Sequence, residues 1–71
     1  MNLIFTCSTQ KDFDDFKRIV NQSKYHADSV NYEFKSLYFN CSDQQDADKL
    51  EADIQDLADI HEISGHFELE D

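Results

Sequence analysis

The chain has 71 residues and a formal net charge of −10, from 16 acidic and 6 basic residues. This length fits one small domain over residues 1–71 and leaves no room for separate cofactor and substrate domains. The charge argues against nucleic acid or an anionic membrane surface as a direct partner and favours a basic one. Hydrophobic residues make up only 39% of the chain, but the 13% that are aromatic can bury large areas.

Apolar runs and cysteine usage indicate the compartment. The longest apolar run, Leu3-Ile4-Phe5, is far short of the ~20 residues of a membrane span. The first residues lack the basic, apolar and small-residue pattern of a secretory leader, so we expect none. Cys7 and Cys41 are too few for a disulfide scaffold and lack metal-site spacing, so we expect reduced, buried thiols. These features predict a cytoplasmic protein.

Residues 1–23 predict a strand followed by an amphipathic helix. Residues 2–7 predict a strand with Leu3, Phe5 and Cys7 on one face. Ser8-Thr9 offers a helix N-cap, and a helix over about residues 10–23 follows. The apolar residues at helical spacing are Phe13, Phe16, Ile19 and Val20.

Residues 30–41 have the alternation of β-structure, but its phase changes midway. Apolar residues occupy even positions in 30–34 and odd positions in 37–41. A phase change across Lys35-Ser36 indicates either a tight hairpin or one long strand with a bulge. We favour the hairpin, although the turn lacks the Asn-Gly or Asp-Gly pair of a two-residue loop.

The remaining residues predict a second helix and a last strand. Ser42 and Gln45 fit a capping box, and a helix over about residues 43–59 follows. Its apolar stripe consists of Ala47, Leu50, Ile54, Leu57 and Ala58. Residues 66–70 alternate as a strand, with Gly65 as the turn or bulge before it.

The element order β-α-β-β-α-β predicts the fold class. It indicates an α+β, ferredoxin-like βαββαβ sandwich, an antiparallel sheet with two helices on one face. In that topology Cys7 and Cys41 lie at opposite edges of the sheet, too far apart for a disulfide. Ile4 and Tyr38 should point to the open face of the sheet. A bulged strand instead of the hairpin would leave three strands and remove these expectations.

The negative charge is concentrated in the second half of the chain. Residues 1–35 contain five basic and five acidic residues, whereas residues 36–71 contain only Lys49 against eleven acidic residues. On the predicted second helix, acids three positions apart repel each other at a cost of a few tenths of a kcal/mol per pair. Such a face is either simply solvated or a functional surface. A bias of the whole proteome would have acidified the first half too, which weakens the case for a merely solvated face.

We therefore predict a partner-binding surface made of acidic side chains. Seven acids over positions 43–59 give about one charge per ~3.5 Å of helix, comparable to one nucleic-acid strand. The residues expected to bind the partner are Asp46, Asp53, Asp56, Asp59 and Glu62, with Glu68 and Glu70 as a second patch.

Catalysis, metal binding and RNA binding find little support. The three histidines and two cysteines include no Cys-x-x-Cys and no His pair at helical spacing, so we predict no metal site. A single Gly excludes a Gly-rich phosphate loop, and no nucleophile has a base at a supporting position, so we predict no enzyme and no cofactor. The charge has the wrong sign for RNA binding on the open sheet face.

The leading hypothesis is a small acidic protein-binding module that inhibits or modulates a basic, nucleic-acid-handling protein. It would act as a nucleic-acid mimic, of the type that phages encode as anti-defence inhibitors. The alternative is a small regulatory or assembly domain that forms a homodimer through its sheet and binds a ligand or protein. Strong weakening by salt would favour the first, and sensitivity to a Tyr38 substitution the second.

Overall fold

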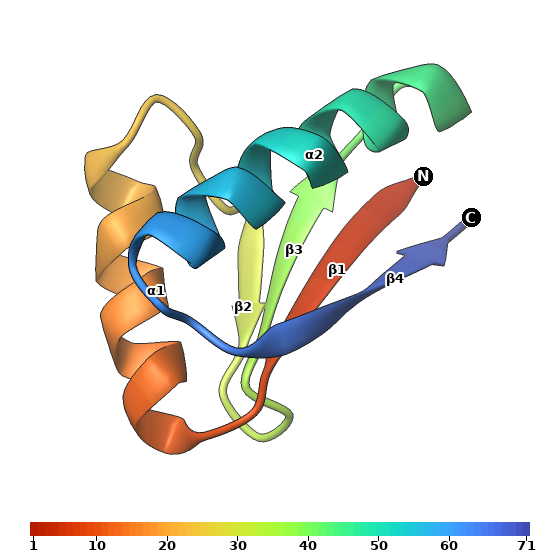
Figure 1. The fold of residues 1–71 in the computed structure, drawn as a ribbon. Helices are drawn as coiled ribbons and strands as arrows, with labels where there is room; N and C mark the ends of the chain where they lie inside the picture. Colours follow the sequence, from red (N-terminus) through yellow and green to blue (C-terminus); the bar gives the residue numbers. More distant parts are fainter.

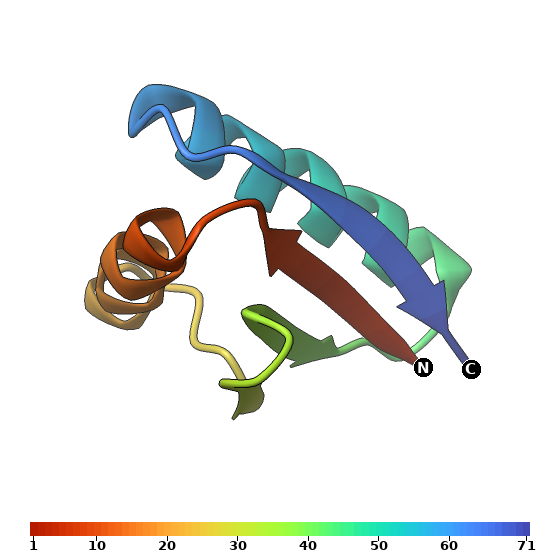
Figure 2. The ribbon, with the colours of Figure 1, turned by 90° about the horizontal axis from the view of Figure 1, so that it is seen from below.

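A computed structural model describes all 71 residues as a four-stranded antiparallel sheet with two helices on one of its faces (Figures 1 and 2). The strand order is β2-β3-β1-β4. In chain order the elements are β1 (Asn2–Cys7), α1 (Gln10–Gln22), β2 (Ser29–Asn31), β3 (Ser36–Asn40), α2 (Gln44–Ile60) and β4 (Gly65–Glu70). This topology confirms the predicted ferredoxin-like fold. Neither helix is both long and apolar enough to cross a lipid bilayer.

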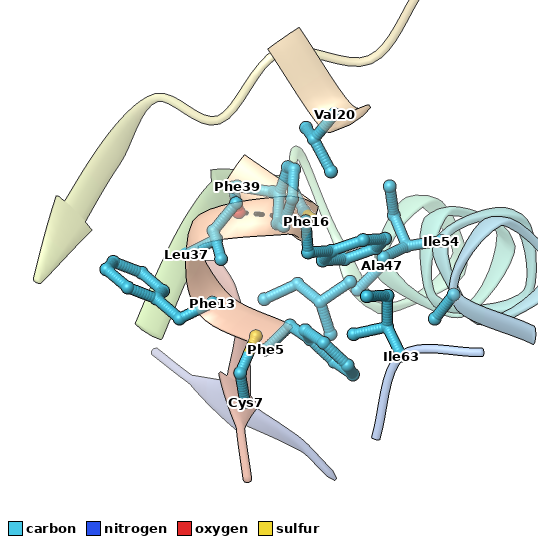
Figure 3. Packing of buried hydrophobic residues seen from close by; sticks show 13 residues of the cluster. Phe5, Cys7, Phe13, Phe16, Val20, Leu37, Phe39, Ala47, Ile54 and Ile63 are labelled. Carbon is cyan, nitrogen blue, oxygen red and sulfur yellow. Dashed lines mark hydrogen bonds between the residues drawn. The ribbon is translucent and has the colours of Figure 1, made fainter. Parts of the chain in front are cut away.

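The core lies between the sheet and the helices, as Figure 3 shows. The odd-numbered residues of β1 face it, because side chains alternate along a strand. Phe5 is central: its ring centroid lies 5.1 Å from that of Phe16 on α1 and 4.8 Å from that of Phe67 on β4. These tilted ring pairs join three elements that are far apart in the sequence.

Helix α1 follows the predicted signals closely. Thr9 is the N-cap, and its hydroxyl accepts a hydrogen bond from the Asp12 backbone N–H at 3.1 Å. Phe13, Phe16 and Val20 are buried at helical spacing. The local sequence and the packed position of α1 therefore agree.

The hairpin between β2 and β3 is confirmed, but its turn covers four residues, 32–35, and not Lys35-Ser36 alone. The carboxamide of Asn31 accepts hydrogen bonds from the N–H groups of Glu33 and Phe34, which bends the chain directly after β2. Lys35 completes the turn with a φ of 56°. Tyr32 and Phe34 consequently lie in the turn, 66% and 62% exposed, and not in the strand.

The N-terminus of α2 differs by one residue from the prediction. Asp43, not Ser42, is the N-cap, and its carboxylate accepts a hydrogen bond from the Asp46 N–H at 2.8 Å. The Asp46 carboxylate in turn accepts one from the Ser42 N–H at 2.9 Å. Gln45 takes no part in this cap. Both candidates are good caps, and the choice of Asp43 shifts the start of the helix by one residue.

Both cysteines are buried as free thiols. Cys7 ends β1, and Cys41 follows β3, which is antiparallel to β1. The two thiols therefore lie at opposite ends of neighbouring strands.

Candidate protein-binding surface

The acidic second half of the chain is not neutralised by basic side chains. Lys11 and Arg18 both pair with Asp15 within α1, at 2.7 Å and 3.4 Å. Among the eleven acids of residues 36–71, only Glu68 lies near a nitrogen base, with its carboxylate 3.7 Å from Nε2 of His66. None of the eleven pairs with a lysine or an arginine. The excess negative charge is thus presented to solvent.

On α2, Asp53, Asp56 and Asp59 fan out over the exposed half of the helix. The fully buried side carries Ala47, Ile54 and Ala58. At 100° per residue, Asp56 points directly away from this side, and Asp53 and Asp59 lie about 60° to its two flanks. These three residues are called the outer face of α2 below.

The two flanks of α2 have different neighbours. On one flank, Asp46 and Asp53 line a groove of about 260 Å³ together with Lys24 and Lys49. Its remaining lining residues are Tyr25 and Leu50. Two carboxylates and two ammonium groups share this groove, so the negative charge of α2 is weakest there. The flank of Asp59 is turned away from it.

Asp46 has a structural role that the sequence pattern did not reveal. Its carboxylate holds the Ser42 N–H before the first turn of α2, as described above. A carboxylate there also interacts favourably with the positive end of the helix dipole. A substitution of Asp46 would therefore disturb the helix start as well as any partner contact.

Asp59 and Asp48 each accept a hydrogen bond from a glutamine one turn earlier. The amide of Gln55 donates to Asp59 at 2.8 Å, and that of Gln44 donates to Asp48 at 2.8 Å. Such pairs stabilise a helix by about 0.2–0.5 kcal/mol without removing the charge. The helix is therefore supported locally by two of its own acidic side chains.

Glu62 lies in the connection between α2 and β4, in an unusual backbone conformation. Its φ of 57° is in the left-handed region, which glycine adopts most easily after a helix. The Ile63 N–H reaches back to the Ala58 carbonyl at 2.8 Å and closes the helix end. The chain thus carries an exposed carboxylate at a position where glycine would be less strained.

Glu68 and Glu70 lie on the other side of the sheet from α2. They alternate with Phe67, which packs on the core, so their side chains point to the open face. These two residues, predicted as a second patch, therefore lie on a different face of the molecule from the acids of α2. The structure brings together Asp53, Asp56 and Asp59 on α2, and separately Glu68 and Glu70 on β4.

The open face of the sheet has a narrow apolar centre. Ile4 and Tyr38 are directly opposite each other in the β1–β3 register, and Ile4 lies outside the core cluster, as predicted. Ile4 is nevertheless only 7% exposed, and Tyr38 is partly buried. Beside them, Thr6 and Ser36 form a hydroxyl–hydroxyl hydrogen bond of 2.8 Å. The face offers no broad apolar patch.

Neither thiol is placed for chemistry. Burial, with a smaller effect of the Asp12 charge, raises the pKa of Cys7 from its usual 9.0 to about 12. Burial also raises the pKa of Cys41. Both remain protonated near neutral pH. No three His, Cys, Asp or Glu side chains lie close enough together to hold a metal ion.

Two features could not be read from the sequence pattern. Tyr32 in the hairpin turn lies beside α1, so that its ring centroid is 4.6 Å from Nζ of Lys17 on that helix. The position of β4 at the edge of the sheet follows only from the topology. The strand itself is predicted by the alternation after Gly65.

Comparison of the chain with protein-family models, curated protein sequences and solved structures finds no match.

Proposed function

We propose that this chain is a small acidic protein-binding module that inhibits or modulates a basic, nucleic-acid-handling protein. The observation that carries the proposal is the absence of lysine or arginine partners for all eleven acids of residues 36–71. A surface serving only solubility would gain stability from interleaved basic residues. Here the uncompensated repulsion is retained, which is typical of a surface kept for recognition.

The outer face of α2 is the part best suited to mimic a nucleic-acid backbone. Its three carboxylates occur at every third residue and rise along the helix by about 4.5 Å per step. A nucleic-acid strand carries one phosphate per ~3.4 Å of the duplex axis. The basic groove of a nucleic-acid enzyme could thus accept either a nucleic-acid strand or the outer face of α2. Binding of this chain would weaken strongly with salt.

The strained Glu62 supports the same reading. A residue held in a sparsely populated backbone conformation often has a role beyond folding. Glu62 follows Asp59 by three residues and adds one more carboxylate just beyond the end of α2. The homodimer hypothesis has less support, because the open sheet face lacks a broad apolar patch.

The proposal can be tested by competition. Proteins captured from a lysate at low salt and eluted at ~0.5 M salt are assayed for binding to a labelled oligonucleotide, with and without this chain. We expect the wild type to displace the oligonucleotide and the Asp56→Lys/Asp59→Lys variant to fail. The matched control is Asp14→Lys/Glu33→Lys, which changes the net charge equally but lies in the balanced half of the chain.

The two double variants decide the matter. If the α2 variant competes as well as the wild type, the acidic docking surface is wrong. If both double variants lose competition equally, net charge and not the α2 surface is responsible, and the specific proposal fails. The proposal is supported if the wild type and the control variant displace the oligonucleotide from a captured protein and the α2 variant does not.

A further inference from the structure

The outer edge of β4 presents backbone groups with no partner. The Ser8 N–H donates to the Ser64 carbonyl at 2.9 Å, which marks a hydrogen-bonded rung between β1 and the start of β4. Hydrogen-bonding direction alternates along an antiparallel strand. The N–H and C=O groups of Gly65, Phe67 and Leu69 therefore point away from β1. No strand lies beyond β4, and no other segment covers this edge in Figure 1.

The two edges of the sheet differ in length. At the opposite edge, β2 has only three residues, and a short edge strand offers little for another chain to pair with. β4 has six residues along its whole free edge. It is the one long template for strand addition in this fold.

The side chains of β4 form two distinct rows beside this edge. On the open face, Glu68 and Glu70 are exposed and about 7 Å apart along the strand. On the helix side lie Phe67, which is partly buried, and Leu69, which is 39% exposed. A strand added here would place its own side chains opposite an acidic row on one face and an apolar row on the other.

We propose that β4 binds an extended segment of a basic partner as a fifth strand of the sheet. The segment alternates basic and apolar residues, so that lysine or arginine faces Glu68 and Glu70 while apolar side chains contact Phe67 and Leu69. Main-chain hydrogen bonds to Gly65, Phe67 and Leu69 supply affinity, and the two rows supply selectivity. The basic character of the partner rests on the function proposed above; the extended conformation rests on the free edge.

Because of its charge, a second copy of this chain fits poorly at the free edge of β4. Two antiparallel β4 edges can pair with Phe67 opposite Phe67, which places Glu68 opposite His66 of the other copy. In that register the two Glu68 side chains lie diagonal to each other, about 7–8 Å apart. Each copy also carries a net charge of −10. The same acids that discourage self-pairing attract a basic segment.

The test uses two fluorescein-labelled peptides of nine residues with identical composition. One alternates lysine and valine, and the other has its lysines and valines in separate blocks. Binding to the full chain is measured by fluorescence anisotropy at low salt. We expect the alternating peptide to bind about tenfold more tightly, because only it forms the ladder and satisfies both rows. Its binding should slow hydrogen exchange at the Phe67 and Leu69 amides.

Two substitutions at position 69 isolate the contribution of the main-chain hydrogen bonds between β4 and the peptide. Leu69→Pro removes an outward N–H and leaves the bonds to β1 intact, since proline is tolerated at such edge positions. Leu69→Ala removes a similar part of the side chain and keeps the N–H. We expect Leu69→Pro to weaken the alternating peptide about five- to tenfold relative to Leu69→Ala. Thermal unfolding of both variants confirms that each is folded.

The outcomes separate this inference from the function on which it rests. If both peptides bind equally and are released by ~0.5 M salt, strand addition is wrong while acidic docking stands. If neither peptide binds and Asp56→Lys/Asp59→Lys still competes for the captured protein, both proposals fail. If the free chain is a dimer that Leu69→Pro dissociates, a second copy occupies the edge and the basic partner is wrong.

Discussion

The carboxylate of Asp12, in the first turn of α1, accepts a hydrogen bond of 3.2 Å from the backbone N–H of Ser64, 52 residues later. The Ser64 carbonyl accepts a second bond, from the Ser8 N–H. Both backbone groups of Ser64 are therefore tied to the turn between β1 and α1. This contact fixes the point at which β4 enters the sheet, and with it the free edge proposed as a binding site.

Replacement of Asp12 by alanine should destabilise the domain by about 1 kcal/mol. The variant loses the bond to Ser64 and a favourable charge at the helix N-terminus. For a domain of this size the melting temperature should fall by about 4–8 °C. Asp14→Ala is the matched control, because Asp14 bonds only to Gln10 on the helix surface. Equal melting temperatures of the two variants would contradict the role of the contact.

Replacement of Gly65 by alanine should be more severe. A Cβ atom at Gly65 would lie 2.4 Å from the Thr6 carbonyl oxygen and 2.6 Å from the Phe5 ring. Overpacking of this kind costs about 1–3 kcal/mol or more, because backbone and a fully buried ring must both shift. Urea denaturation measures the loss. Ser64→Ala, one residue earlier and exposed, should stay within about 0.5 kcal/mol of the wild type; a similar loss in both would show that crowding at Gly65 is not the cause.

Glycine at Glu62 should stabilise the protein and weaken partner binding. The left-handed conformation costs a non-glycine residue about 1–2 kcal/mol. Glycine avoids this cost but loses more backbone entropy on folding, which offsets part of the gain. Lys35→Gly provides the matched control, since Lys35 has nearly the same φ, 56° against 57°. Both variants should gain about 0.5–1 kcal/mol in denaturant unfolding. Only Glu62→Gly should reduce competition with the oligonucleotide; equal competition would remove Glu62 from the binding surface.

The domain should lose stability in alkaline solution through Cys7. Its pKa is about 12 in the fold because of burial and, secondarily, Asp12, whereas the unfolded thiol titrates near 9.0. Between these values the unfolded chain has released the proton and the folded chain has not. The contribution of the Cys7 thiol to the free energy of unfolding is therefore complete below pH 9. Above pH 9 the free energy of unfolding falls by up to about 1.4 kcal/mol per pH unit.

The comparison of the wild type with Cys7→Ala isolates this effect. The variant is less stable at pH 8 because it loses buried volume, and the difference between the two proteins should shrink from pH 9 to pH 11. Urea unfolding at several pH values gives the two curves. Parallel curves over this range would mean that the Cys7 thiol ionises as readily in the fold as in the unfolded chain.

The sequence by itself determined the elements whose signals are local. The apolar spacing of Phe13, Phe16 and Val20 and the hydroxyl of Thr9 predict α1, and they act within one or two helical turns. The opposed phases of residues 30–34 and 37–41 likewise predict a break in the alternation, as a hairpin or a bulge, and the structure has the hairpin. The asymmetry of charge is a property of composition and needs no coordinates.

Only the tertiary structure decided features that depend on which segments become neighbours. The hairpin turn covers residues 32–35 because Asn31 bonds to two amides beyond it, and this choice leaves Tyr32 and Phe34 in solvent. Ser42 and Asp43 are equivalent caps in isolation, and the structure selects Asp43.

The same holds for the candidate binding surface. Helical spacing places Asp53, Asp56 and Asp59 on one exposed half of α2, which a sequence can reveal. Glu68 and Glu70 face the opposite side of the sheet because Phe67 packs on the core, and they lie beside an unpaired edge because β4 pairs only with β1. Pairing between strands is a long-range choice: Phe67 of β4 contributes to it, but only through its contact with the shared core around Phe5.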